Sequence, residues 1–209
     1  MPLPSKKVFF RDYIFYVFES VYEPAEDSFL FAENLTVKRG EVVFDVGVGC
    51  GILGIVAADK AAEVIAVDIN PHAVRCAKEN AKLNGVADKM MFMQSNLFTP
   101  IKIKTGEKFD LILFNAPYLP SENSEDESWL RHAWTGGITG RQVIDQFIFE
   151  APKYLKMNGC ILLMQSTLSN INKTLQGFEK NRLETSIIAK RALPFFEKLV
   201  LIKAKCSNL

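Results

Sequence analysis

The chain has 209 residues, of which 48% are hydrophobic and 23% are charged. This length and balance are typical of one soluble globular domain, so we expect a single domain over residues 1–209. The formal net charge is only +1, which gives no argument for a nucleic-acid partner, although such a total does not exclude a local basic patch.

The cysteines and the N-terminal region indicate a cytoplasmic protein. The cysteines, at positions 50, 76, 160 and 206, form no CxxC pair and no zinc-ligand spacing, so we expect reduced thiols and no bound metal. The apolar stretch Phe9–Phe18 is short and contains Arg11 and Asp12. We therefore expect neither a signal peptide nor a membrane-spanning segment in the extension formed by residues 1–40.

From residue 41 onward, strand-like and helix-like patterns alternate. Five apolar runs are typical of buried strands: Val42–Val46, Val64–Asp68, Met90–Gln94, Asp110–Phe114 and Cys160–Met164. Pro71–Leu83 predicts a helix that ends at Asn84-Gly85, and Arg141–Leu155 has the apolar spacing of another helix. Buried strands separated by helices predict a mostly parallel sheet that is covered on both faces.

The last part of the chain breaks this alternation. Leu183–Ala192 and Phe196–Ala204 both have strand patterns, with a short connection through Leu193-Pro194. So short a link cannot hold a crossover helix, and the two strands should pair antiparallel. The predicted fold class is α/β, with a Rossmann-like, mostly parallel sheet that ends in an antiparallel hairpin.

A long polar segment separates two of the predicted elements. Leu119–Gly140 is acidic in its first half and contains Trp129, Trp134 and Gly136-Gly137. Loops of this length without secondary structure are uncommon unless they bind or cover a ligand. We expect this segment to be a substrate lid beside Asn115, with an ordinary surface loop as the alternative.

A glycine-rich loop follows the first clear strand. In FDVGVGCGILG, the pattern Gly49-x-Gly51-x-x-Gly54 matches the dinucleotide-binding fingerprint, and Asp68 lies 19 residues after Gly49, at the end of the next strand. Glycines let the backbone approach a ligand, and a carboxylate at that place accepts hydrogen bonds from a ribose. The alternative is a strand–helix turn whose glycines serve packing alone.

The loop by itself does not distinguish a nicotinamide cofactor from S-adenosylmethionine, since both contain an adenosine ribose. Asp45 precedes the glycines, where its charge would repel a pyrophosphate but suits an ammonium or sulfonium group. The C-terminal hairpin is also foreign to the usual dehydrogenase sheet. Both features favour S-adenosylmethionine. Asn96 and Leu97 follow the third strand, where they could contact an adenine or form a simple turn.

Several stretches together resemble a known family. VYEPAEDSFLF, DVGVGCG, DINPHAV, NAPY and AWTGGITGRQVIDQF are similar to motifs of HemK-type methyltransferases, which modify a glutamine side-chain amide in peptide chain release factors. The similarity runs from about Val21 to Phe147 and is strongest to the short archaeal and eukaryotic branch. It implies a seven-stranded Rossmann-like enzyme that uses S-adenosylmethionine and acts on the Gly-Gly-Gln motif of a release factor.

The resemblance also implies the site residues. Those implied to contact the cofactor are Ser28, Asp45, Gly47, Gly49, Asp68, Asn96, Leu97 and Asn115. The implied catalytic segment is Asn115-Ala116-Pro117-Tyr118, in which Asn115 and Tyr118 bind the substrate. Two positions depart from the family pattern. Ala116 stands in place of a proline but keeps its backbone carbonyl, and Asn96 stands in place of an acid but keeps an acceptor oxygen.

The chemistry explains why such a segment is useful. A glutamine amide is a poor nucleophile because its nitrogen lone pair is delocalised into the carbonyl. If the Asn115 side-chain oxygen accepts one amide hydrogen and the Ala116 carbonyl accepts the other, the nitrogen is held with its face toward the methyl donor. Two acceptors also stabilise the positive charge that develops on nitrogen, and no dedicated general base is required.

Other residues near these motifs have simpler interpretations. We expect Glu26 and Asp27 to act as charges at a helix N-terminus. Tyr118 either stacks on the amide or forms a wall of the pocket. The two tryptophans of the lid should serve its packing, and His132 should be an exposed loop residue.

Other functions compete with this interpretation. An adenine-specific nucleic-acid methyltransferase uses the same Asn-x-Pro-Tyr arrangement, but the acidic stretch SENSEDE in the lid would repel phosphates. A cofactor-binding subunit without activity would explain Ala116 and Asn96. A nicotinamide-dependent dehydrogenase is disfavoured by Asp45 and by the C-terminal hairpin.

The third strand could bind a partner. KMMFMQ is rich in methionine, and if it forms the edge of the sheet its open ladder invites pairing with another chain. The resemblance implies such a partner, because members of this branch often work with a small zinc-binding activator protein. The alternative is an apolar strand covered by the protein's own helices.

Overall fold

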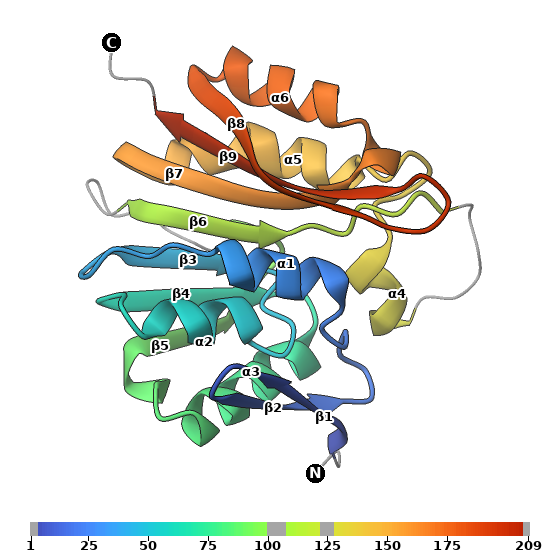
Figure 1. The fold of residues 1–209 in the computed structure, drawn as a ribbon. Coiled ribbons are helices and arrows are strands. Elements are labelled where there is room, and N and C mark those ends of the chain that lie inside the picture. Colours follow the sequence, from blue (N-terminus) through green and yellow to red (C-terminus); the bar gives the residue numbers. More distant parts are fainter. Residues whose placement is uncertain (1–3, 100–107, 122–127, 207–209) are drawn as a thin grey trace.

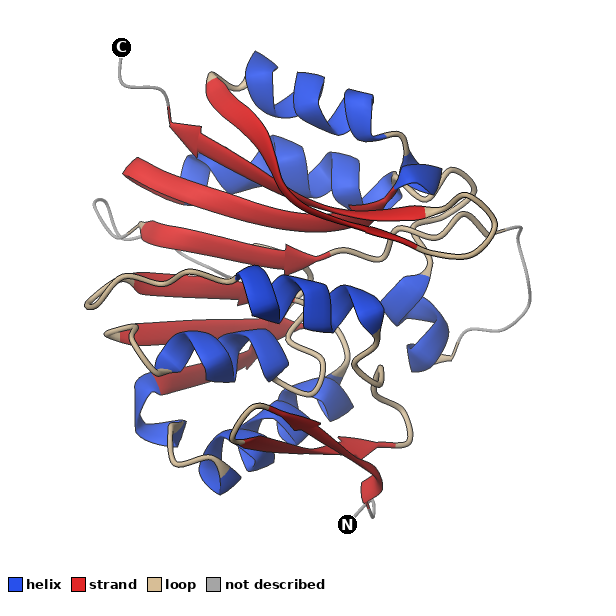
Figure 2. Ribbon diagram, in the orientation of Figure 1, coloured by secondary structure: helices blue, strands red, loops and turns tan. Residues whose placement is uncertain are grey.

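Seven strands form one sheet, and helices cover both of its faces (Figure 1 and Figure 2). The computed structural model describes residues 4–99, 108–121 and 128–206. The sheet strands are β3 (Val42–Val46), β4 (Glu63–Asp68), β5 (Met90–Gln94), β6 (Phe109–Asn115), β7 (Leu155–Ser166), β8 (Leu183–Ala192) and β9 (Lys198–Cys206). Their order is β5-β4-β3-β6-β7-β9-β8.

The strand directions confirm the predicted fold class. Strands β3 to β7 are parallel to one another, whereas β9 is antiparallel to both β7 and β8. The carboxyl ends of the parallel strands therefore meet at one edge of the sheet, where α/β proteins bind their ligands. We call this the carboxyl edge.

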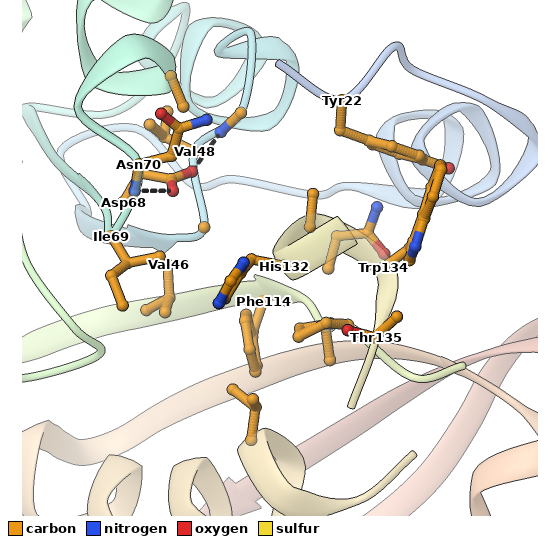
Figure 3. Close-up of a pocket in the computed structure, with 18 of the residues that line it drawn as sticks. Tyr22, Val46, Val48, Asp68, Ile69, Asn70, Phe114, His132, Trp134 and Thr135 are labelled. Atoms are coloured by element: carbon orange, nitrogen blue, oxygen red, sulfur yellow. Dashed lines mark hydrogen bonds between the residues drawn. The ribbon is translucent and has the colours of Figure 1, made fainter. Parts of the chain in front are cut away.

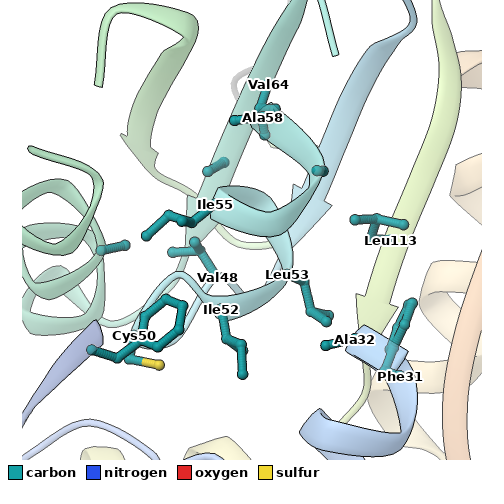
Figure 4. Close-up of a cluster of buried hydrophobic side chains, with 14 of the residues drawn as sticks. Phe31, Ala32, Val48, Cys50, Ile52, Leu53, Ile55, Ala58, Val64 and Leu113 are labelled. Carbon is teal, nitrogen blue, oxygen red and sulfur yellow. The ribbon is translucent and has the colours of Figure 1, made fainter. Parts of the chain in front are cut away.

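Each face of the sheet has its own apolar core. The helices are α1 (Glu26–Asn34), α2 (Ile52–Ala58), α3 (Pro71–Leu83), α4 (Trp129–Trp134), α5 (Gln142–Glu150) and α6 (Ile171–Lys180). Phe31 of α1, Leu53 of α2 and Leu113 of β6 meet in one core (Figure 4). Side chains of α5 and α6 fill the other, together with Phe44 of β3. Alternate residues of a strand point to opposite faces, so β3 supplies both cores.

Most boundaries agree with the sequence patterns, and two predictions were wrong. The helix predicted over Arg141–Leu155 ends at Glu150, because Pro152 cannot donate the next helical hydrogen bond; a 3₁₀ turn, η2 (Ala151–Tyr154), follows it. The last strand begins at Lys198 and not at Phe196. Phe195 and Phe196 have positive φ angles of 61° and 65°, which are incompatible with a strand.

The first forty residues hold structure that the sequence analysis did not predict. Strands β1 (Pro4–Phe10) and β2 (Tyr13–Phe18) form an antiparallel hairpin that lies against α3. Asn84 exchanges hydrogen bonds of 3.0 and 2.8 Å with the backbone of Ile14, and Asn80 exchanges two of 2.9 Å with Tyr16. These two amides lie one helical turn apart. They bind the free backbone N–H and C=O groups at the edge of β2, as a neighbouring strand would.

The described part of the predicted lid is folded and is not an irregular loop. Residues 122–127, which hold most of the acidic stretch, lie outside the described residues. Helix α4 follows them, and Ser128 caps it by accepting a hydrogen bond from the Arg131 N–H. The Leu119 N–H donates to the Trp134 carbonyl at 2.9 Å, which ties α4 to the segment after β6. Within the described ranges, no helix is long and apolar enough to cross a membrane.

Candidate active site

A cavity of about 500 Å³ opens at the carboxyl edge. Figure 3 shows Asp68 and Asn70 on one side of it and Tyr22 and Trp134 on the other. All the predicted site residues except Asp45 line the cavity, namely Ser28, Gly47, Gly49, Asp68, Asn96, Leu97, Asn115, Ala116, Pro117 and Tyr118. The fold thus brings together segments that lie far apart in the chain.

Backbone groups hold the carboxylate at one side of the cavity. Gly49, at a φ of +55°, directs its N–H to the Asp68 carboxylate at 3.0 Å, and the Asn70 N–H donates to the other oxygen at 2.9 Å (Figure 3). A Cβ added to Gly49 would meet no atom within 4 Å, so the space before the loop is open. Burial raises the pKa of Asp68, while the backbone donors lower it. The result is a fixed acceptor pair beside open space.

The loop after β5 supplies the next part of the wall. Leu97 is buried at a positive φ of 49°, and Asn96 is exposed beside it. The Ser95 hydroxyl lies 3.0 Å from the Leu97 carbonyl and 2.6 Å from the Thr99 carbonyl, which stabilises this turn. Leu97 thus offers an apolar surface to the cavity, and Asn96 offers an amide.

Asp45 corrects one expectation from the sequence. Its side chain is 1% exposed and does not line the cavity, because residue 45 of β3 points to the face that α2 covers. Neither of its carboxylate oxygens has a hydrogen-bond partner within the described ranges. Burial raises the pKa of Asp45 to about 7, and the nearby Gly54 N–H, although it is outside hydrogen-bond geometry, lowers it. Asp45 therefore lies beneath the glycine loop and not at the ligand surface.

Asn115, at the end of β6, is held by side chains from α1. Its Nδ2 donates to the Asp27 carboxylate at 3.2 Å and to the Ser28 hydroxyl at 3.3 Å. Since a carboxylate only accepts hydrogen bonds, the NH₂ end of the amide must face Asp27. The Asn115 Oδ1 is buried and has no partner among the described residues. This oxygen is therefore an oriented hydrogen-bond acceptor that can bind a donor from a ligand.

Asp27 is the residue that the sequence analysis undervalued. It does lie in the first turn of α1, as expected of a helix N-terminal charge, but it is only 5% exposed. Besides Asn115, its carboxylate accepts from the Tyr118 hydroxyl at 3.2 Å, the Tyr22 hydroxyl at 3.2 and 3.3 Å, and the Ser28 N–H at 2.6 Å. Burial and the charge of Asp27 raise the pKa of both tyrosines, which keeps them as donors. The sequence did contain one indication of this role: the neighbouring Ser28 is among the predicted site residues, so Asp27 beside it was a candidate too.

The stretch TGGITGR supports the backbone of the segment after β6. A Cβ on Gly140, which has a φ of +68°, would stand 2.2 Å from the Tyr118 carbonyl oxygen, so only glycine fits there. The next residue, Arg141, is buried and donates to the Asn170 carbonyl at 2.8 Å and the Thr174 hydroxyl at 3.0 Å. This motif is therefore a support for residues 117–118.

Helix α4 forms part of the cavity wall. Trp129, His132 and Trp134 all line the cavity, and His132 lies near Phe114 in the view of Figure 3. His132 is exposed, as expected, but it lies on a helix and not in a loop. Its Nδ1 lies 3.0 Å from the Ser128 carbonyl. The tryptophans, expected only to pack the lid, thus also line the cavity.

Comparisons with known proteins agree with this geometry. Residues 20–190 match the family profile described as the methyltransferase small domain. The chain is 44% identical over 183 residues to a Methanocaldococcus jannaschii protein with the provisional name protein N5-glutamine methyltransferase, covering 87% of this chain and 90% of that one. It is 31% identical to human methyltransferase HEMK2, covering 84% and 86% of the two chains.

A solved structure shares the fold. The E. cuniculi Mtq2–Trm112 complex, described as responsible for methylation of the eRF1 translation termination factor, superposes with a TM-score of 0.69 at 22% identity, covering 90% of this chain and 99% of that one. A match at this identity supports the fold alone. With the profile and the two relatives, the conclusion is that this chain belongs to the methyltransferase small domain family, in the HemK-type group that contains HEMK2.

Proposed function

We propose that this protein transfers a methyl group from S-adenosylmethionine to the side-chain amide nitrogen of a glutamine, in the Gly-Gly-Gln motif of a peptide chain release factor. The observation that carries the proposal is the buried, unpartnered Oδ1 of Asn115, whose orientation Asp27 fixes. A buried acceptor without a donor is costly for the fold and is most simply explained by a ligand that supplies one.

The residues on the Asp68 side fit S-adenosylmethionine. The carboxylate of Asp68 has free acceptor sites for two ribose hydroxyls, and Gly49 leaves the space beside it open. Leu97 and Ile69 offer apolar contacts for an adenine, and the Asn96 amide oxygen can accept from its amino group. When bound, this cofactor supplies a methyl group on a positively charged sulfur, which is already activated for transfer.

The residues on the Asn115 side fit a planar amide. The Asn115 Oδ1 accepts one amide hydrogen of the glutamine, and the Ala116 carbonyl oxygen accepts the other. Two acceptors in one plane fix the nitrogen and direct its face into the shared cavity. Tyr118, anchored through its hydroxyl to Asp27, forms the wall beside the amide.

The electrostatics of the site favour the charge that develops on the nitrogen. Asp27 lies behind Asn115 and polarises its amide, so that the Oδ1 is a stronger acceptor. As positive charge builds on the substrate nitrogen, both acceptors bind it more tightly. The product amide then loses a proton to solvent, so the scheme requires no histidine or carboxylate as a base.

A protein substrate is preferred over a nucleic acid. Two relatives that are at least 30% identical are named for glutamine in proteins: the Methanocaldococcus jannaschii protein and an Aquifex aeolicus protein named release factor glutamine methyltransferase. An exocyclic adenine amine is also planar and would fit two acceptors. Its phosphates, however, would need basic side chains around the cavity, and the wall residues are mostly apolar or uncharged.

A second chain could assist at the free edge of the sheet. Strand β5 is the first strand in the sheet order, and among the described strands it pairs only with β4; Met91 on it is 49% exposed. We propose that a small zinc-binding activator protein pairs with this strand. The Mtq2 chain of the similar solved structure is in a complex with Trm112.

The test is transfer of labelled methyl from S-adenosylmethionine to a purified release factor, with and without the glutamine of its Gly-Gly-Gln motif. We expect labelling of the intact factor by wild-type protein, none when that glutamine is replaced, and a strongly reduced rate when Asn115→Ala is used. Equal labelling in all three cases would refute the glutamine assignment. Labelling of an adenine oligonucleotide in place of the factor would support the nucleic-acid alternative.

A further inference from the structure

Two adjacent phenylalanines stand fully exposed at one turn of the molecule. Phe195 is 97% exposed and Phe196 is 100% exposed, between strands β8 and β9. Single exposed apolar residues are common on proteins, but two neighbouring aromatic rings without any cover are unusual. Burial in the fold does not explain them.

The backbone of this turn is also unfavourable for phenylalanine. Both residues have positive φ angles, of 61° and 65°, at the two central positions of a tight hairpin turn. Such turns favour Asn-Gly, because bulky side chains are strained in the left-handed region. Asn and Gly at these two positions would avoid both the exposed rings and the backbone strain, yet the sequence has phenylalanine at both. Departures of this kind concentrate at functional sites.

The turn lies at the same edge of the sheet as the cavity. Strand β9 is antiparallel to β7, with Leu199 opposite Ser166 at the carboxyl end of β7. The Lys198 N–H donates at 3.0 Å to the Thr167 hydroxyl, just after that end, and the charge of Glu197 contributes to the raised pKa of Tyr118. Figure 1 shows the turn on the same side of the sheet as α4.

Other exposed apolar side chains lie at this edge. Trp134 is 44% exposed, Ile138 is 72% exposed and Leu168 is 52% exposed, and all three follow the carboxyl ends of β6 or β7. We call these three residues, with Phe195 and Phe196, the apolar rim. Arg141 links the Ile138 loop to the Leu168 turn through its bond to the Asn170 carbonyl. Of the rim residues, Trp134 itself lines the cavity.

We propose that the Phe195-Phe196 turn docks the methylated protein, by inserting its rings into an apolar recess on that protein. This inference rests on the proposed function. A glutamine side chain reaches Asn115 only if the chain that carries it crosses the mouth of the cavity, so the surrounding substrate surface must cover the rim. Two rigid aromatic rings offer large apolar area with little entropy to lose on binding. A membrane bound at the same rim would close the mouth to a protein substrate.

The fold itself supplies a sharp test, because the favoured turn residues remove the rings without harming the hairpin. In the double variant Phe195→Asn/Phe196→Gly, we expect the KM for the intact release factor to rise about tenfold or more. We expect the melting temperature to stay equal or rise. The affinity for S-adenosylmethionine and the activity toward a short Gly-Gly-Gln peptide, which is too small to reach the turn, should not change.

The matched control is Met157→Asn, which removes an apolar residue that is 89% exposed near the opposite end of β7. It should leave the KM unchanged.

An unchanged KM in the double variant, while wild type methylates the factor, would overturn the docking role and leave the proposed function intact. If wild type methylates neither factor nor peptide, the proposed function fails and the docking role with it. Sedimentation with phosphatidylserine-containing vesicles that is lost in the double variant, with an unchanged KM, would assign the rings to a membrane and overturn the proposal.

Discussion

The two sides of the cavity are held by different kinds of contact. On one side, backbone N–H groups within 19 residues of Asp68 fix its carboxylate. On the other, side chains 87 and 88 residues away fix the amide of Asn115. A backbone donor stays in place when most side chains change, whereas a side-chain network fails when any one member is replaced. We therefore expect the cofactor side to tolerate substitution better than the substrate side.

The largest effect should follow loss of the acceptor itself. In Asn115→Ala the substrate nitrogen loses one of its two acceptors, and we expect kcat to fall about 100-fold to 1,000-fold. The affinity for S-adenosylmethionine should change much less, because Asp68 and the glycine loop remain. Single-turnover methyl transfer and calorimetric titration with the cofactor separate the two effects. A loss of cofactor affinity as large as the loss in kcat would contradict the assignment of Asn115 to the substrate side.

A somewhat smaller loss is expected when the support of Asn115 is changed. Asp27→Asn replaces an acceptor-only group with one that also donates, so the Asn115 amide is no longer held in one orientation. We expect kcat to fall about 10-fold to 100-fold. Since Asp27 acts through Asn115, the double variant with Asn115→Ala should be no slower than Asn115→Ala alone. Additive losses would show that Asp27 acts mainly through Tyr118 and Tyr22, whose hydroxyls it also binds, and not through Asn115.

On the cofactor side, Asp68→Asn keeps the shape and one acceptor oxygen. We expect the dissociation constant for S-adenosylmethionine to rise about tenfold, with kcat at saturating cofactor nearly preserved. Binding measured by titration, compared with kcat at high cofactor concentration, is the check. A kcat loss as large as that of Asn115→Ala would contradict the contrast between the two sides.

The smallest effect on catalysis should come from Asp45, which lies beneath the loop. Its pKa is raised to about 7 by burial, above its ordinary value near 4, so the contribution of this one group to stability is greatest below pH 4 and is lost as the pH rises through 7. The loss is at most about 1.4 kcal/mol per pH unit for this group. Urea unfolding of Asp45→Asn should show a shallower decline between pH 4.5 and 7.5 than wild type. Equal slopes would mean that Asp45 is ionised throughout.

The same contrast explains how much the sequence could predict. The strands of the sheet, the glycine loop and Asp68 follow from local patterns, because the residues that define them lie close together along the chain. The roles of Asp27 and α4 depend on which distant segments meet, and no local pattern reports that. The misplacement of Asp45 shows that a motif gives a residue's neighbourhood but not the face to which it points. The late start of β9 depends on two left-handed phenylalanines that resemble a strand by composition.

The central claim is that Asn115 Oδ1 receives a hydrogen bond from the substrate amide. A crystal structure of the protein with S-adenosylhomocysteine and a Gly-Gly-Gln peptide measures this directly. We predict the glutamine nitrogen within about 3.2 Å of Oδ1, with Asp27 still bound to Nδ2. A glutamine side chain outside the cavity, or an Oδ1 that is bonded to another group of the protein, would contradict the account.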